Sequence, residues 1–177
     1  MASIPLRDLL TGGDRRSIGR VPDVLRIVRR QPRRARELIV TLSDADPIVR
    51  MRAADALEKA SAAHPELLRP HQRILLRLAR YATQQELRWH LAQLVPRLPL
   101  TAHQRLEAAA VFESYLRDRS AIVRTSAMQA LADLASVDRR LWTRVVRRLR
   151  RLTITGTPAM RARGRCLLKA LGARPAA

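Results

Sequence analysis

Arginine is the most prominent residue type in this chain that could bind a ligand. The 177 residues contain 35 Lys and Arg against 15 Asp and Glu, and all of these bases except Lys59 and Lys169 are arginine. The excess is uneven: Arg139 to Arg174 supply eleven arginines, and no acidic residue follows Asp138. A guanidinium binds phosphate and carboxylate groups through paired hydrogen bonds. The charge therefore predicts a polyanionic partner, with nucleic acid ahead of an anionic membrane surface.

The densest run of arginines predicts a basic helix over residues 139–152. Seven arginines fall within residues 139–151, around an apolar stripe of leucine and valine. This helix could clamp phosphates, lie on an anionic membrane, or be a solvated outer helix. The lack of acids favours the first role. Membrane binding is less favoured, because Trp142 and the leucines are needed for packing the last repeat. The predicted polyanion-binding residues are Arg140, Arg144, Arg147, Arg148 and Arg151.

Catalytic and cofactor chemistry has little support in the sequence. The four histidines have no metal-ligand spacing with one another or with Cys166, and Gly12-Gly13 is not followed by the Lys-Ser or Lys-Thr of a phosphate loop. We expect no enzyme activity, no metal and no cofactor. A single cysteine excludes an intrachain disulfide, and no stretch approaches the roughly 20 apolar residues of a membrane span. The expected location is the cytoplasm.

A pattern that occurs four times indicates which elements must position the arginines. An apolar residue followed by Arg recurs at intervals of 38, 36 and 37 residues. The positions three, six and seven residues after each Arg are apolar or small, as on one face of an α-helix. The four pairs are Val49-Arg50, Leu87-Arg88, Val123-Arg124 and Met160-Arg161. A fixed period in this range is typical of helical repeat proteins.

Capping residues and prolines divide the chain into helices joined by short turns. The repeated helices are predicted at about 47–62, 84–95, 120–135 and 158–171. Each follows a companion helix, at about 32–42, 70–81, 102–117 and 139–152, and a further helix is expected through residue 30. We therefore predict an all-α fold with a single domain over residues 21–172. Residues 1–20 are expected to be weakly structured, and residues 173–177 to form a tail.

The repeated segment resembles the second helix of a HEAT repeat and its preceding turn. The first copy reads Asp44-x-Asp46-Pro47-x-Val49-Arg50-x-x-Ala53-x-x-Ala56-Leu57, and the copy that starts at Asp118 matches nearly as well. The second and fourth copies depart in the turn, with Ala82 and Gln84 in one and two threonines in the other. The resemblance covers about residues 32–171.

The resemblance to HEAT (armadillo-like) repeats implies a right-handed α-α superhelix of about four helix pairs plus an N-terminal helix. It also implies that the repeated arginines are structural, because a buried guanidinium needs turn carboxylates or carbonyls as partners. The repeated helices would then line a concave surface. Concave surfaces are the usual binding surfaces of such proteins.

A polar stripe follows the repeated helices at two, five and nine residues after each repeated Arg. It could grip an extended partner, or it could be a solvated helix face. Trp89 could stack on a nucleobase or fill a gap in the core, and we expect His90 to be hydrogen-bonded and partly buried. The predicted partner-binding residues of the stripe and its neighbours are Arg52, Asp55, Lys59, Trp89, His90, Gln93, Gln129, Asp133, Arg163 and Arg165.

Three functions fit these patterns. The first is a non-enzymatic scaffold that binds another macromolecule through the concave face. The alternative is a nucleic-acid-binding protein without sequence preference. The third is a HEAT-like DNA glycosylase for alkylated bases, a family that combines a basic groove and stacking tryptophans with a catalytic aspartate one turn after one of them. Here Gln93 stands one turn after Trp89 and cannot supply a carboxylate.

Overall fold

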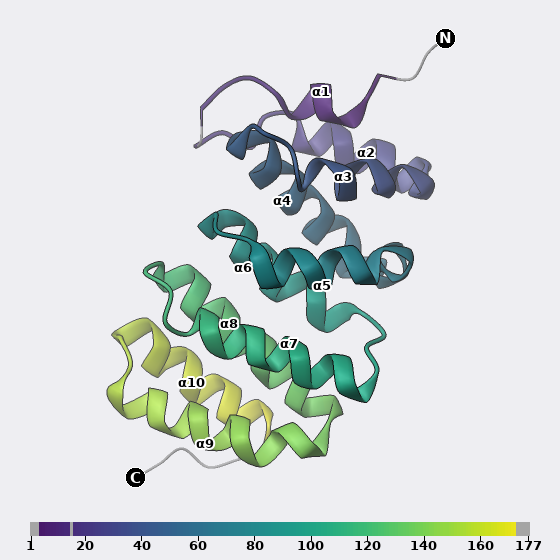
Figure 1. The fold of residues 1–177 in the computed structure, drawn as a ribbon. Helices are drawn as coiled ribbons and strands as arrows, with labels where there is room; N and C mark the ends of the chain where they lie inside the picture. The colour runs from purple at the N-terminus through teal and green to yellow at the C-terminus, as the bar shows by residue number, and fades with distance from the viewer. Residues whose placement is uncertain (1–3, 15, 173–177) are drawn as a thin grey trace. The chain divides into compact units, whose positions relative to one another are not determined.

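The chain is built from antiparallel pairs of α-helices joined by short turns (Figure 1). The computed structural model describes residues 4–14 and 16–172, and this part of the chain contains no strand. The predicted fold class, all-α with helical repeats, is confirmed. The helices fall into two compact units, residues 1–98 and 99–177, where the sequence predicted one domain over residues 21–172. The predicted tail, 173–177, lies outside the described residues.

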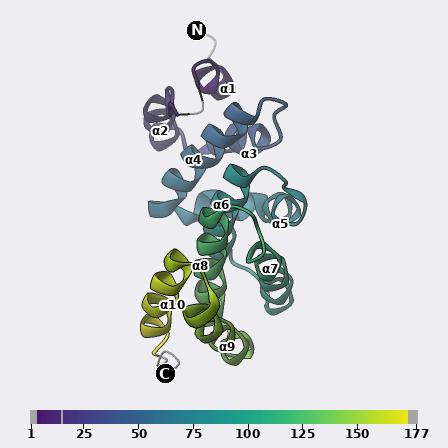
Figure 2. The ribbon, with the colours of Figure 1, turned by 90° about the vertical axis from the view of Figure 1, so that its left-hand side faces the viewer.

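Unit 1 is a two-layered stack (Figure 2). One layer holds α2, α4 and α6, and the other holds α1, α3 and α5. Helix α4 packs against α1, α2, α3 and α6, so it is the central element of the unit. The helices are α1 (Leu6–Leu10), α2 (Val21–Arg30), α3 (Ala35–Thr41), α4 (Pro47–Ala63), α5 (Gln72–Tyr81) and α6 (Gln85–Leu94). Short 3₁₀ turns lie at Pro32–Arg34, Pro65–His71 and Val95–Arg97.

Unit 2 consists of two helix pairs, and α8 is central to it. Its helices are α7 (Ala102–Tyr115), α8 (Ala121–Val137), α9 (Arg139–Thr155) and α10 (Pro158–Ala170). Helix α8 packs against the other three, and α9 packs along α10. At Gly164 a β-carbon would lie 2.7 Å from Cγ2 of Thr153, so the close approach of α9 and α10 requires glycine there. The repeated helices α4, α6, α8 and α10 begin and end within two residues of their predicted ranges.

Side-chain caps fix where most of the longer helices begin. Asp46 accepts from the amide of Ile48 at 2.8 Å, and Pro47 follows at the first helical position. Thr101, Ser120, Asp138 and Thr157 cap α7 to α10 in the same way. The amides at a helix start have no acceptor within the helix, so each cap gives a hydrogen-bond partner to an N–H group that would otherwise lack one in the protein. The Leu-, Ala- and Val-rich faces predicted from the sequence are buried.

The N-terminal segment is more ordered than the sequence predicted. Residues 1–20 were expected to be weakly structured, but Leu6–Leu10 form α1, and Leu6 and Leu10 are fully buried. The prediction missed the apolar face made by leucines three and four residues apart, which packs on α2, α3 and α4. Residues 1–3 and 15 lie outside the described part. The N-terminal end therefore adds a helix pair, α1 and α2, to unit 1.

The repeated arginines are structural in three of the four copies. Nη1 of Arg50 donates to the carbonyl oxygens of Asp44 and Ala45 at 2.5 and 3.0 Å. Arg124 binds the carbonyl of Asp118 at 2.8 Å, and Arg88 binds that of Ala82 at 2.7 Å. Each guanidinium thus donates to the carbonyl oxygen of the residue six positions before it, in the turn that precedes its helix. The prediction is confirmed for these copies.

The fourth repeated arginine, Arg161, is exposed. Helix α9 continues through Thr155, so the turn before α10 contains only Gly156 and Thr157. The residue six positions before Arg161 is therefore Thr155, whose carbonyl belongs to a helix end rather than to an open turn. The structural role predicted for Arg161 is wrong for this reason.

Candidate functional site

Arg52 lies in the predicted partner-binding stripe, but it is buried, with 1% of its surface exposed. Its Nε donates to the carbonyl of Ser17 at 3.0 Å, and Nη2 donates to that of Asp14 at 3.0 Å. Nη1 donates to Leu10 at 2.9 Å and also to Gly12. Because the segment between α1 and α2 wraps this guanidinium, Arg52 cannot contact a partner. Its assignment as a partner-binding residue is wrong.

His90 is also buried, with 7% of its surface exposed. Burial lowers the pKa of its imidazole from 6.5 to about 4, although the nearby carboxylates of Asp55 and Glu58 act in the opposite direction. Its Nδ1 atom makes no hydrogen bond within the described residues. His90 is therefore a neutral core histidine, packed 5.5 Å from the ring of Trp89. It is not available to a partner, and the hydrogen bond expected from the sequence is not made at Nδ1.

The other stripe residues of unit 1 form a small polar surface on α4 and α6. Asp55 and Lys59 make an ion pair of 2.7 Å along α4. On α6, Trp89 is half-buried, and Nε2 of Gln93 donates to the carbonyl of Trp89 at 3.3 Å. This surface carries one exposed cation, one paired acid and part of an indole ring.

The stripe residues of unit 2 divide into a part with one acid, on α8, and a basic part, on α10. On α8, Nε2 of Gln129 donates to Asp133 at 2.6 Å. On α10, Arg163 and Arg165 are exposed and make no ion pair within the described residues. Arg161, Arg165 and Lys169 follow one another at intervals of four residues and so form a basic stripe along one side of α10.

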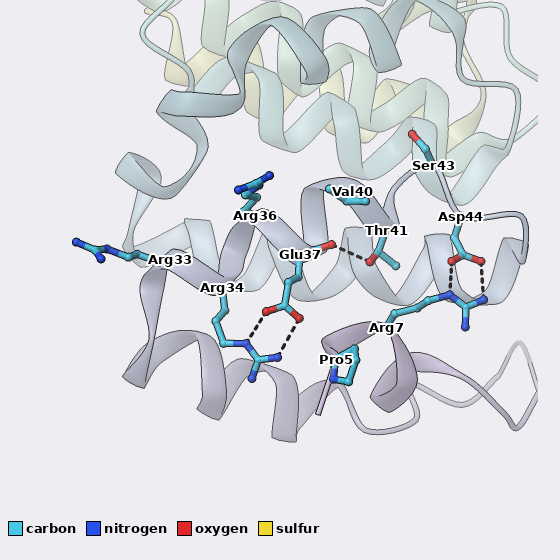
Figure 3. Close-up of a pocket in the computed structure, with 10 residues that line it drawn as sticks. All are labelled: Pro5, Arg7, Arg33, Arg34, Arg36, Glu37, Val40, Thr41, Ser43 and Asp44. Atoms are coloured by element: carbon cyan, nitrogen blue, oxygen red, sulfur yellow. Dashed lines mark hydrogen bonds and ion pairs between the residues drawn. The ribbon is translucent and has the colours of Figure 1, made fainter. Parts of the chain in front are cut away.

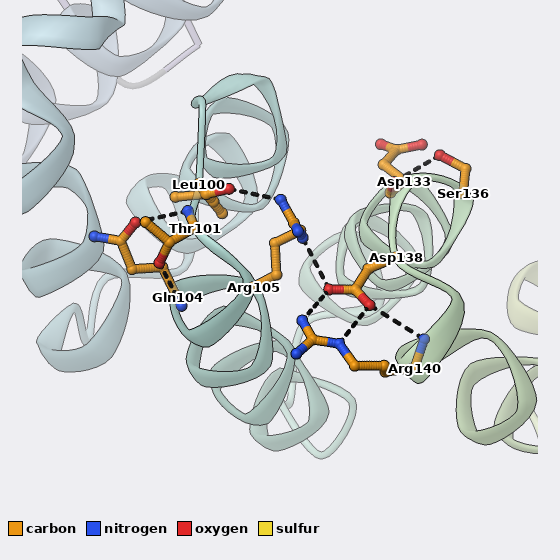
Figure 4. Close-up of polar contacts among 8 residues, drawn as sticks. All are labelled: Leu100, Thr101, Gln104, Arg105, Asp133, Ser136, Asp138 and Arg140. Atoms are coloured by element: carbon orange, nitrogen blue, oxygen red, sulfur yellow. Dashed lines mark hydrogen bonds and ion pairs between the residues drawn. The ribbon is translucent and has the colours of Figure 1, made fainter.

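The first of the predicted polyanion-binding arginines, Arg140, is already occupied (Figure 4). Its Nε donates to Oδ1 of Asp138 at 2.9 Å and its Nη2 to Oδ2 at 2.6 Å, and Arg105 of α7 binds the same carboxylate at 2.9 Å. The two guanidinium groups, Arg140 first, hold the pKa of Asp138 well below its usual range. This network joins α7 to the start of α9. Arg140 is therefore a structural residue more than a binding residue.

The remaining four arginines gather around one acid, Glu113 of α7. Nε of Arg148 lies 2.9 Å from Glu113, and Nε of Arg144 lies 3.8 Å from it. The side chains of Arg147 and Arg151 are exposed and make no ion pair or hydrogen bond within the described residues. These five residues line a hollow of about 290 Å³, which we call the α9 arginine surface. Arg144, Arg147, Arg148 and Arg151 thus lie together as predicted, whereas the part played by Glu113 was not foreseen.

A larger pocket of about 730 Å³ lies beside α1 and α3 in unit 1 (Figure 3). Two of its arginines are neutralised: Arg7 pairs with Asp44 at 2.6 Å, and Arg34 pairs with Glu37 at 2.5 Å. Figure 3 shows Arg33 and Arg36 apart from these ion pairs. None of the residues predicted from the sequence to bind a partner or a polyanion lines this pocket, although the Arg33-Arg34-x-Arg36 cluster is a sequence signal for it.

The comparisons with known proteins support the fold alone. No family model matches the chain. No curated protein matches it either. The chain is similar to the crystal structure of an engineered protein from the Northeast Structural Genomics Consortium, with a TM-score of 0.63 and 17% identity over 94% of this chain and 78% of that one. At this level of identity the likeness extends to the helical fold and not to function.

Exposed arginines are the most prominent charged feature of the described residues. They contain no cluster of three or more His, Cys, Asp or Glu side chains that could hold a metal ion. None of the helices in this part of the chain has the length and apolarity needed to cross a membrane. What they do present is exposed guanidinium groups on α9 and α10, with Asp138 beside Arg140 and Glu113 beside Arg148. Such groups bind phosphates with little reorganisation.

Proposed function

We propose that this protein acts in the cytoplasm by binding nucleic acid, without catalysis, through the α9 arginine surface. The observation that carries the proposal is the placement of four arginines around a single carboxylate, Glu113, with Arg147 and Arg151 unpaired among the described residues. The acid-free sequence after Asp138 supports it, because nothing there would repel a polyanion.

The geometry suits contacts with the phosphate backbone. Arg144 and Arg151 are seven residues apart on α9, so they span about 10 Å along the helix at about 1.5 Å per residue. Phosphates of one DNA strand rise by about 3.4 Å each along the duplex axis and lie farther apart along the strand, so this span can reach neighbouring phosphates. Glu113 holds Nε of Arg148 and leaves the outer nitrogens of that guanidinium for a ligand. Phosphate contacts carry no base information, so we expect binding without sequence preference.

The test measures affinity for a labelled DNA duplex as a function of salt. For the wild-type protein, log K should fall steeply and linearly with log salt concentration. Arg147→Ala together with Arg151→Ala should weaken binding and reduce the slope by about 0.9 for each phosphate that is no longer neutralised. The matched control is Arg29→Ala with Arg30→Ala, which removes two exposed arginines from α2. A flat salt dependence with duplex, single-stranded DNA and RNA would reject the proposal.

A protein partner is the second candidate, and the half-buried Trp89 on α6 favours it. Partly exposed tryptophans are enriched at binding hot spots, and the resemblance to HEAT repeats points to a scaffold. A pull-down with and without nuclease separates the two candidates. A protein retained after nuclease treatment and lost on Trp89→Ala would support the scaffold. Partners that disappear with nuclease would support nucleic acid.

A further inference from the structure

A second hollow, of about 380 Å³, lies wholly within unit 1, where the turn before α4 meets the turn before α6. Its volume is near the lower end of the roughly 300–1,000 Å³ that small-molecule pockets occupy. None of the residues selected from the sequence as binding residues lies in it. The lining residues are Leu42, Ser43, Asp44, Arg50, Arg77, Leu78, Tyr81, Ala82, Thr83, Gln84 and Leu87.

Three polar side chains that line this hollow, Arg50, Gln84 and Asp44, already have hydrogen-bond or ion-pair partners. Nε of Arg50 donates to the side-chain oxygen of Gln84 at 2.8 Å, and Nε2 of Gln84 donates to the carbonyl of Pro47 at 2.8 Å. Asp44 is paired with Arg7. Leucine side chains supply the apolar part of the lining. Asp44 is the acid in this lining, so the hollow offers no unpaired acid to repel an anion.

The lining of the hollow also contains an aromatic ring, Tyr81, and a cation, Arg77, and a second cation, Arg80, lies over that ring. Tyr81 is the last residue of α5 and is 69% exposed. Cζ of Arg80 lies 5.8 Å from the centre of the Tyr81 ring. Arg77, one turn before Tyr81 on α5, lines the hollow, and neither arginine makes an ion pair or hydrogen bond within the described residues. A flat apolar ligand group with a phosphate beside it matches this combination.

We propose that the hollow binds a base of a single-stranded nucleic acid, stacked on Tyr81, with the adjacent phosphate on Arg77 or Arg80. The proposal rests on the proposed function and extends it to a second site, in unit 1. A base in a duplex is covered on both faces by its neighbours, whereas a single strand can present a free face to an aromatic side chain. The Tyr81 site therefore gives a preference for single strands that phosphate contacts on α9 cannot give.

The experiment compares a labelled single strand with its duplex at one salt concentration. Tyr81→Ala should lower the single-strand affinity roughly 5- to 150-fold, the range for removal of one stacked base, and leave the duplex affinity unchanged. Tyr81→Phe keeps the ring and should bind as the wild type does. Val40→Ala is the matched control, because Val40 is another exposed side chain of the same helix layer but does not line this hollow. Circular dichroism melting confirms that each variant is folded.

The outcomes separate this proposal from the one on which it rests. If Tyr81→Ala leaves both affinities unchanged, or lowers both equally, while the double α9 variant still weakens binding, the Tyr81 site is wrong and the proposed function stands. If the wild-type protein binds neither nucleic acid, both are wrong. A nucleoside monophosphate that binds more tightly than the single strand would mean that the hollow serves a free nucleotide, which also overturns the proposal.

Discussion

Arg50 and Arg52 lie two residues apart on α4, yet their guanidinium groups have different tasks. Arg50 binds carbonyls of the turn just before its own helix, whereas Arg52 binds carbonyls some 40 positions earlier in the chain. Arg147 on α9 has no partner at all among the described residues. The same side chain thus acts as a turn brace, a buried anchor or a free cation. The carbonyls and carboxylates within its reach decide which.

His90 should make the stability of the protein depend on pH. Its folded pKa, about 4, is below the ordinary value of 6.5, so between these two values the unfolded chain binds a proton that the folded chain does not. The contribution of His90 to the free energy of unfolding should therefore be fully present above pH 6.5, and the free energy of unfolding should fall by about 3 kcal/mol as the pH drops to 4. Urea unfolding at a series of pH values measures this.

The variant His90→Gln should flatten most of that pH dependence, whereas His103→Gln should not, because His103 is exposed. A residual slope is expected from His71, whose pKa is also lowered, by burial and by Arg36. The readout is the slope and not the absolute stability, so a less stable variant still gives an answer. An equal slope in the wild type and in His90→Gln would contradict the assignment of a buried neutral histidine.

At the scale of elements, Arg52 of α4 binds carbonyl groups of the segment between α1 and α2. Gly19 has a φ of +55°, and a β-carbon there would lie 3.0 Å from Cζ of Arg52. Gly12 has a φ of +74° in the same segment, but its β-carbon would meet nothing within 4 Å. Both positions favour glycine for backbone reasons, but only Gly19 also needs it for space beside Arg52.

We therefore expect Gly19→Ala to destabilise the protein more than Gly12→Ala. Each substitution should cost about 1–2 kcal/mol from the left-handed backbone alone. Gly19→Ala must also displace a guanidinium that its carbonyl partners hold in place, so its effect should be larger. Urea unfolding of the two variants gives the difference. Equal destabilisation would mean that the Arg52 anchor contributes little to the stability of unit 1.

The helices could be predicted from the sequence because their signals are local. Asp46-Pro47 and Thr157-Pro158 mark helix starts, and apolar residues at helical spacing mark the buried faces. Helix α1 was missed because a five-residue helix has too few positions to show a period. The role of Arg161 was missed because it depends on where the preceding helix ends.

The candidate sites were harder to predict because they depend on contacts between distant segments. Spacing places Arg52 on the polar side of α4, and nothing in the spacing shows that carbonyl groups of Leu10 and Ser17 bind its guanidinium. Glu113 and Arg148 are on different helices, so their pairing has no sequence signature. By contrast, the arginines of α9 lie on one helix, and their grouping followed from helical periodicity alone.

At the scale of the whole molecule, the net charge of +20 opposes folding. Several of the described acids already have basic partners, so they are not available to the remaining arginines. These acids are Asp23, Asp44, Asp55, Glu37 and Asp138. Repulsion among the remaining arginines is relieved when salt screens it or when a polyanion binds. The surface that we propose for binding is therefore also a source of instability.

Salt should for this reason stabilise the protein. We expect the melting temperature to rise with sodium chloride up to about 0.5 M, by roughly 2–4 °C for each kcal/mol of repulsion removed. Arg147→Ala with Arg151→Ala should raise the melting temperature at low salt and shrink the response to salt. Arg29→Ala with Arg30→Ala removes the same charge from α2. A smaller effect of this control would mean that the repulsion is local to the α9 arginines and does not come from the net charge alone. A melting temperature that falls as salt is added would mean that the stabilising ion pairs outweigh the repulsion between arginines. The destabilisation that we assign to the α9 arginine surface would then be wrong.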